Sequence, residues 1–176
     1  FVFYGDTVMD FDMNAMLSYH REKKADATLF LHPNDHPYDS DIVELDGTGK
    51  VTRFFNKPHE DGFISKNIVN AALFIFSPRI LEEIEVGVKS HIEKNVLPRC
   101  LDKGLNLYGY VSAEYIKDMG TPDRYYAVCN DVISGKVARL NRINSRPAIF
   151  LDRDGTISKE VNLLNKVEDL ELIEGA

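Results

Sequence analysis

Tryptophan is absent from the 176-residue sequence, and cysteine occurs only twice, at Cys100 and Cys129. The two cysteines are far apart, and neither has a cysteine or histidine neighbour at the spacing of a zinc motif. A zinc finger and a disulfide framework are therefore excluded, and a reducing, cytoplasmic setting is expected. No apolar run approaches the roughly 18 residues that a membrane-spanning helix needs, so no segment is expected to cross a bilayer.

Basic residues are also in deficit. The sequence has 21 Lys and Arg against 28 Asp and Glu, which gives a formal net charge of −7. This balance repels phosphate backbones, so nucleic acid is not an expected partner. Hydrophobic residues at 44% and charged residues at 28% are typical of a globular protein, and the length suits one domain with part of a second.

The sequence begins at Phe1, and residues 1–4 already have the pattern of a buried strand. The last seven residues end without a closing element. We therefore expect an interior piece of a longer protein.

Strand-like and helix-like segments alternate along the chain. Strands are expected at residues 1–4, 27–31, 42–45, 51–55, 68–76, 107–111 and 115–117. Helices are expected after Asp12, Ser77, Ser90 and Thr121, with Pro98 interrupting the third. This alternation predicts an α/β fold with a mixed sheet in residues 1–136.

A basic stretch without acidic residues follows, and we interpret residues 137–147 as a linker. A new apolar strand is expected at residues 148–151. It would open a second α/β unit, residues 148–176.

Four polar motifs lie on or directly after predicted strands of the first unit. They are Gly5-Asp6, Asn56-Lys57-Pro58, Val69-Asn70 and Asp118-x-Gly-Thr-Pro. Taken singly, each also fits a plain turn, an exposed lysine or a helix cap. In open α/β sheets, however, ligands bind beyond the carboxyl ends of strands.

In this order the motifs resemble those of the sugar-1-phosphate nucleotidyltransferases, enzymes with a Rossmann-like mixed sheet. The resemblance implies transfer of a nucleotide from a nucleoside triphosphate to a sugar phosphate, with release of pyrophosphate. It implies that Asp6 and Asp118 hold Mg²⁺, the cofactor, which suits an ion that takes one or two carboxylates. It also implies that Lys57 is a catalytic residue that pairs with the sugar phosphate, and that Asn70 binds sugar hydroxyls.

The sequence departs from the family pattern at two positions. Asn56 stands where glutamate is common, and Ala72 stands where glycine is common. The glycine-rich, arginine-containing loop that cradles the triphosphate in such enzymes is not found in this sequence. We therefore expect this sequence to contain the half of the active site that binds the sugar and the metal ion. We expect this part of the protein to be inactive when alone.

The loop at residues 32–41 is rich in His, Asp and Pro. A metal site there is one interpretation. A proline-constrained turn that caps its own backbone is the interpretation we prefer, and a role beside the sugar stays open.

The segment Asp152-Arg153-Asp154-Gly155-Thr156 after the expected strand resembles the first motif of the haloacid dehalogenase phosphatases. The resemblance implies that Asp152 attacks phosphorus, that Asp154 acts as general acid and base, and that both bind Mg²⁺. An acidic calcium-type loop or a plain turn is the structural alternative.

Together the two units resemble bifunctional bacterial heptose enzymes, which join a heptose 1-phosphate guanylyltransferase to a heptose 1,7-bisphosphate phosphatase. The expected substrates are then GTP and a heptose or mannose 1-phosphate. Two alternatives stay open: a mannose-1-phosphate guanylyltransferase with an unrelated phosphatase, and a non-catalytic regulatory or binding subunit. The sequence leaves open whether the protein forms a homo-oligomer.

Overall fold

The computed structural model describes residues 1–34, 40–60, 63 and 65–176. The chain divides into two compact units, Phe1–Asn144 and Ser145–Ala176, which are treated one at a time. Within the described ranges, no helix is both long enough and apolar enough to cross a membrane. The centre of the 32–41 loop lies outside the described residues, and with it most of the alternative metal site.

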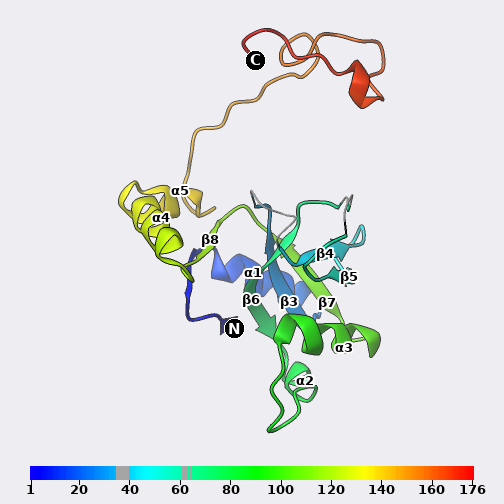
Figure 1. The fold of residues 1–176 in the computed structure, drawn as a ribbon, viewed down its shortest axis with the longest axis vertical. Helices are drawn as coiled ribbons and strands as arrows, with labels where there is room; N and C mark the ends of the chain where they lie inside the picture. Colours follow the sequence, from blue (N-terminus) through cyan, green and yellow to red (C-terminus); the bar gives the residue numbers. More distant parts are fainter. Residues whose placement is uncertain (35–39, 61–62, 64) are drawn as a thin grey trace. The chain divides into compact units, whose positions relative to one another are not determined.

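A six-stranded mixed sheet forms the centre of the larger unit (Figure 1). The strand order is β5–β4–β6–β3–β7, and β1 pairs with β6 as well. Only β3 and β7 are parallel among these pairs. The strands are β1 Val2–Phe3, β3 Ala27–His32, β4 Ile42–Leu45, β5 Val51–Phe55, β6 Val69–Phe76 and β7 Leu107–Val111. The predicted mixed α/β sheet is confirmed.

The sheet is covered on both faces because its central strands are apolar on both sides. Side chains alternate along β3, so Leu29 and Leu31 belong to one core cluster and Phe30 to the other. The first cluster includes residues of α2 (Pro78–Leu81) and α3 (Leu97–Asp102). The second includes residues of α1 (Met13–Glu22). The two clusters make a three-layer core.

A separate two-stranded ribbon was not predicted from the sequence. β2 (Thr7–Asp10) pairs antiparallel with β8 (Tyr115–Asp118), and Thr7 lies opposite Asp118. The strand predicted at residues 1–4 is present as β1, but the prediction that it is buried was wrong, since Phe1 and Phe3 are 43% and 45% exposed. Asp6 therefore lies between an edge strand and the ribbon.

Two helices begin at predicted caps that form a side-chain hydrogen bond. The Asp12 carboxylate accepts a hydrogen bond from the N–H of Ala15 at 3.0 Å, at the start of α1. The Thr121 hydroxyl accepts one from the N–H of Arg124, at the start of α4 (Pro122–Ile133). Each cap pairs a backbone donor that the helix itself leaves open.

Pro98 interrupts the third predicted helix, as expected. The chain forms a π-helix at Ile92–Val96 and then continues as α3. Pro98 has no N–H to offer the preceding turn, which explains the change of helix type.

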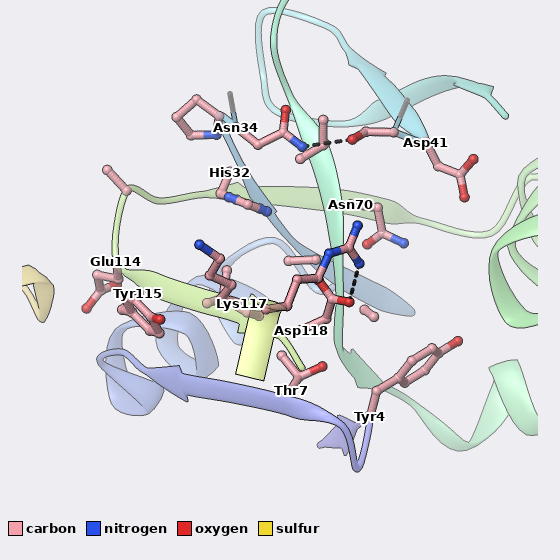
Figure 2. Close-up of a pocket in the computed structure, with 18 of the residues that line it drawn as sticks. Tyr4, Thr7, His32, Asn34, Asp41, Asn70, Glu114, Tyr115, Lys117 and Asp118 are labelled. Carbon is pink, nitrogen blue, oxygen red and sulfur yellow. Dashed lines mark hydrogen bonds and ion pairs between the residues drawn. The ribbon is translucent and has the colours of Figure 1, made fainter. Parts of the chain in front are cut away.

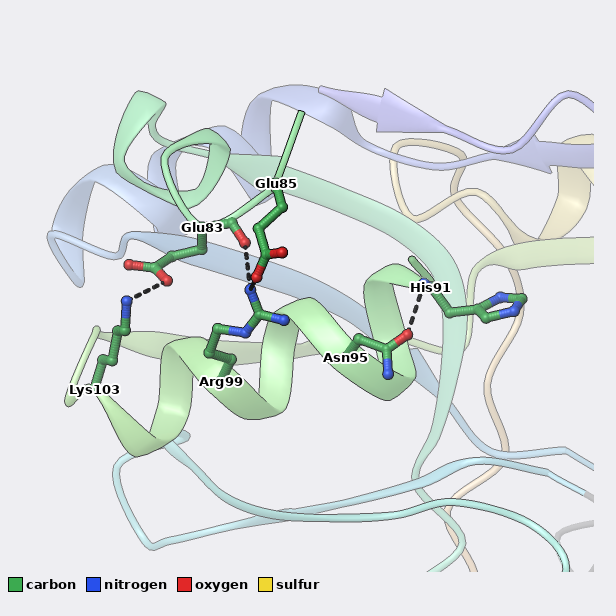
Figure 3. A network of polar contacts seen from close by, with 6 residues as sticks. All are labelled: Glu83, Glu85, His91, Asn95, Arg99 and Lys103. Atoms are coloured by element: carbon green, nitrogen blue, oxygen red, sulfur yellow. Dashed lines mark hydrogen bonds and ion pairs between the residues drawn. The ribbon is translucent and has the colours of Figure 1, made fainter. Parts of the chain in front are cut away.

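Polar contacts attach α3 to the segment that precedes the π-helix (Figure 3). Arg99 donates to the Glu83 carbonyl at 3.2 Å and to the Glu85 carboxylate at 3.0 Å. Lys103 forms an ion pair with the Glu83 carboxylate at 2.7 Å. These contacts fix the segment between α2 and the π-helix.

The predicted linker is only partly a linker. Residues 136–140 form α5 (Lys136–Leu140), and Asn141 is buried with its amide donating to the Asp10 carboxylate at 2.5 Å. Arg142 donates to the Tyr110 hydroxyl at 2.7 Å. This segment thus belongs to the larger unit as far as Asn144.

The smaller unit lacks the buried strand predicted at residues 148–151. These residues have no strand pairing, and Ile149 and Phe150 are 84% and 95% exposed. The prediction was wrong because an apolar run forms a strand only when a neighbouring strand pairs with it. Among residues 145–176 strand pairing is limited to isolated bridges, which join Ser158 to Asp154 and to Leu172, and one short 3-10 helix lies at Val167–Asp169.

Candidate functional site

A cavity of about 690 Å³ lies beside the open end of the ribbon. Its lining includes all four polar residues that the sequence singled out in the first unit, Asp6, Lys57, Asn70 and Asp118. Figure 2 shows Asn70 and Asp118 around the same hollow, with Thr7 of the ribbon nearby. The fold thus brings together residues that are far apart in the sequence.

Asp6 and Asp118 are held next to each other by the ribbon. Asp6 immediately precedes Thr7, the partner of Asp118 in the β2–β8 pairing. The Asp6 carbonyl also accepts a hydrogen bond of 2.7 Å from the N–H of Met119. The backbone pairing therefore places both residues at one end of the ribbon.

Gly120 leaves room for the Asp118 side chain. A Cβ atom added at Gly120 would lie 3.3 Å from Oδ2 of Asp118, closer than most Cβ contacts. The same Oδ2 accepts a hydrogen bond of 2.5 Å from the Arg124 guanidinium. The glycine of the Asp-x-Gly-Thr-Pro motif is thus explained by the carboxylate two residues before it.

Asn70 lies on β6 where the strand is irregular. Ala72 has a φ of +55°, in the left-handed region, and the pairing of β3 with β6 shifts register between Leu29 and Leu31. Oδ1 of Asn70 is buried and has no hydrogen-bond partner. An unpaired buried acceptor is costly, and this one lines the cavity, where a ligand can supply the missing donor.

Asp41 connects the segments that carry Lys57 and Asn70. Its carbonyl accepts from the N–H of Asn70 at 3.1 Å, and its carboxylate accepts from the N–H of Lys57 at 3.0 Å. The Lys57 side chain itself is exposed at the cavity. The sequence placed Asp41 only in the 32–41 loop, because nothing in its local pattern indicates contacts with two distant segments.

Two further polar pairs in the cavity lining were missed. The Tyr4 hydroxyl donates to the Glu93 carboxylate at 2.6 Å, and burial together with this contact raises the pKa of Tyr4 well above its usual value. The Tyr115 hydroxyl donates to the Asp131 carboxylate at 3.0 Å, and Lys136 forms an ion pair with Asp131 at 3.1 Å. Burial alone would raise the pKa of Asp131. The hydrogen bonds from Lys136 and Tyr115 together have the larger effect, so the pKa of Asp131 is lowered.

The donor set at the ribbon fits Mg²⁺ better than a transition metal. Across the part of the chain that the structure describes, no three or more His, Cys, Asp or Glu side chains gather as a metal-binding group. Zinc sites need three or four such ligands, whereas Mg²⁺ takes one or two carboxylates and completes its shell with phosphate and water. Asp6 and Asp118 are the residues that could hold it.

Asp152 and Asp154 lie in the smaller unit. Arg153 forms two hydrogen bonds to the Asp154 carboxylate, at 2.8 and 2.9 Å, and these lower the pKa of Asp154. One Asp152 oxygen accepts from the N–H of Arg153. Gly155 has a φ of +74°, which allows the tight turn after these acids.

Curated relatives share the larger unit. A mannose-1-phosphate guanylyltransferase of Mycobacterium tuberculosis is 31% identical over 135 residues, which cover 76% of this chain and 37% of the relative. A glucose-1-phosphate adenylyltransferase of Desulfitobacterium hafniense is 32% identical over 137 residues, which cover 73% of this chain and 34% of the relative. The chain thus spans little more than a third of either relative.

A solved structure shares the fold. HddC from Yersinia pseudotuberculosis superposes with a TM-score of 0.58 at 22% identity, over 74% of this chain and 53% of HddC. The family model described as Nucleotidyl transferase matches residues 1–135. Since that match covers well over half of the sequence, the chain belongs to the nucleotidyl transferase family.

Proposed function

We propose that the protein transfers a nucleotide from a nucleoside triphosphate to a sugar 1-phosphate and releases pyrophosphate. One observation carries the proposal: Asp6, Lys57, Asn70 and Asp118 come from four separate segments and line one cavity. In the reaction, a phosphate oxygen of the sugar phosphate attacks the α-phosphorus. The bond from this phosphorus to the oxygen that bridges to the β-phosphorus breaks, and pyrophosphate leaves.

The charge of each site residue determines which group it would bind. Asp6 and Asp118 would hold Mg²⁺, which when bound neutralises charge on the α-phosphate. Lys57 is a cation suited to the incoming sugar phosphate. The unpaired Oδ1 of Asn70 accepts a hydrogen bond from a sugar hydroxyl. Because both reactants are anions, catalysis depends mainly on positioning and charge neutralisation.

For the substrate we propose GTP with a mannose-type or heptose 1-phosphate. The mannose-1-phosphate guanylyltransferase of M. tuberculosis supports this choice. The adenylyltransferase of D. hafniense is nearly as similar, so the assay must compare bases. A second crystal structure of HddC holds that protein in complex with GMP-PN, which also favours testing a guanine nucleotide first.

A non-catalytic binding subunit is the alternative. The presence of both acids together with Gly120, which makes room for Asp118, favours catalysis. A phosphatase activity remains our proposal for the whole protein on the sequence Asp152–Thr156 alone, with Asp152 as nucleophile and Asp154 as acid and base; both would hold Mg²⁺.

The test is pyrophosphate release by the whole protein across four nucleoside triphosphates and a panel of sugar 1-phosphates. We expect release with GTP and a manno-configured sugar, and a loss of about 10²–10³-fold in Asp118→Asn, as for other electrostatic deletions. Asp102→Asn, an exposed acid at the end of α3, serves as the matched control. Full activity in Asp118→Asn, or no release with any pair of substrates, would refute the proposal.

A further inference from the structure

Arg124 occupies the carboxylate that the proposed metal ion needs. Its Nη1 lies 2.5 Å from Oδ2 of Asp118, and both residues line the cavity. Figure 2 draws this ion pair as a dashed line at Asp118. The contact gives Asp118 a charge partner inside the protein.

The local structure holds this pair in place from both sides. Thr121 caps α4 by accepting the N–H of Arg124, which fixes the arginine backbone in the first turn of the helix. The ribbon fixes Asp118 opposite Thr7, and Gly120 leaves the carboxylate just enough space. The ion pair therefore closes a short loop between β8 and α4.

A guanidinium and a divalent cation compete for the same carboxylate. Close approach of Mg²⁺ to Asp118 places it beside the positive charge of Arg124, and this repulsion weakens cation binding. The triphosphate of a nucleotide changes the balance, because its negative charge attracts both cations. Arginine binds phosphate oxygens through two parallel N–H donors, so it gains a new partner when it leaves the carboxylate.

We infer that Arg124 is a positioning residue that covers Asp118 until the nucleotide arrives, so that the divalent cation enters with the nucleotide and not before it. The inference rests on the proposed function, since it assumes that Asp118 is a ligand of the catalytic metal. It assigns to Arg124 a role in the order of binding.

The test measures binding of Mn²⁺ alone to the whole protein, by the loss of the free-ion electron paramagnetic resonance signal without nucleotide. We expect Arg124→Gln to bind Mn²⁺ more tightly by on the order of fivefold, the factor contributed by a well-formed exposed ion pair. The gain must vanish when Arg124→Gln is combined with Asp118→Asn. Arg139→Gln removes an equal charge from an exposed site on α5 and must leave the affinity unchanged.

A second arm adds inorganic triphosphate as the probe for the phosphates of the nucleotide. The advantage of Arg124→Gln should then disappear, because Arg124 of the wild type has moved from Asp118 to the phosphates. An unchanged Mn²⁺ affinity in Arg124→Gln overturns the inference, and so does a gain that persists without the Asp118 carboxylate or in the presence of triphosphate. Neither arm needs turnover, so failure of pyrophosphate release refutes the proposed function separately.

Discussion

Asn70 carries a cost to the fold that a substrate can remove. Its Oδ1 and the Ser77 hydroxyl are the buried side-chain atoms without a partner in the described part of the chain. A buried acceptor left unpaired costs about 1–3 kcal/mol. The sequence indicated Asn70 through its motif, but the missing partner depends on the irregular pairing near Ala72, which no local pattern predicts.

Replacement of Asn70 should change the proposed binding of the sugar phosphate without lowering the stability of the fold. We expect Asn70→Ala to keep the free energy of unfolding at least as high as in wild type, because the substitution breaks no side-chain hydrogen bond and removes the unpaired acceptor. The KM for the sugar phosphate should rise by up to about tenfold, the value of one hydrogen bond. Steady-state kinetics and urea unfolding of the whole protein measure the two effects.

The matched control is Asn95, whose carboxamide accepts from the N–H of His91 at the start of the π-helix. Asn95→Ala should lower stability by about 1 kcal/mol, as the loss of a helix cap does, and leave the KM unchanged. Loss of stability in Asn70→Ala with an unchanged KM would contradict a role in sugar binding.

His20 makes stability depend on pH. Nδ1 of His20 lies 2.8 Å from the buried Thr28 hydroxyl, and burial lowers the pKa of His20 below its usual 6.5. Below pH 6.5 the unfolded chain takes up a proton that the folded chain does not. The free energy of unfolding should therefore decrease as the pH is lowered. Urea unfolding between pH 7.5 and about 5 measures this slope.

His20→Gln should reduce the slope, whereas His91→Gln, at an exposed position, should leave it as in wild type. An equal slope in wild type and His20→Gln would exclude His20 as its source.

The elements that could be predicted carry their information locally. α1 and α4 were found from the caps Asp12 and Thr121, and the paired strands β4 and β5 from their strand-like segments at residues 42–45 and 51–55. β2 was missed because its four residues pair only with β8, which lies far along the chain. The helix expected after Ser90 begins one residue later, with His91 at its N-cap, and the N–H of His91 donates to Asn95.

The buried carboxylate of Glu114 connects three segments of the chain by hydrogen bonds. It accepts hydrogen bonds from the N–H of Asp12, the N–H of Arg142 and the Ser112 hydroxyl, at 2.8, 3.1 and 2.8 Å. We expect Glu114→Ala to lower the free energy of unfolding by about 3 kcal/mol, because it leaves these donors unpaired. Glu114→Gln keeps an acceptor oxygen and should cost less.

Urea unfolding of the whole protein checks this order of stabilities, with the exposed Glu82→Ala as control. If Glu114→Ala were as stable as the control, the carboxylate would not hold these elements together.

At the scale of the whole chain, the boundary between the units is later and shorter than the predicted linker. Asn141 and Arg142 are bonded to the larger unit, whereas Ile149 and Phe150 are exposed. The basic composition of residues 137–147 indicated a joint but could not distinguish bonded from free arginines.

Limited proteolysis locates the boundary. We expect chymotrypsin to cut first after Phe150, because its extended and exposed backbone fits a protease cleft without unfolding. Mass spectrometry of the earliest fragments identifies the bond, and Phe150→Ala should delay that cut. A first cut by trypsin or chymotrypsin within residues 139–144 would instead show that the bonded segment opens before the exposed one.

The two acids are positioned by the ribbon and not by the main sheet. β2 and β8 form a sheet separate from the main one, while Lys57 and Asn70 belong to segments joined through Asp41 beside the main sheet. Hydrogen bonding thus joins Asp6 and Asp118 to one unit, and Lys57 and Asn70 to another. The distance between the two acids and the pair Lys57 and Asn70 therefore depends on how the ribbon is held against the main sheet, and not on either sheet alone.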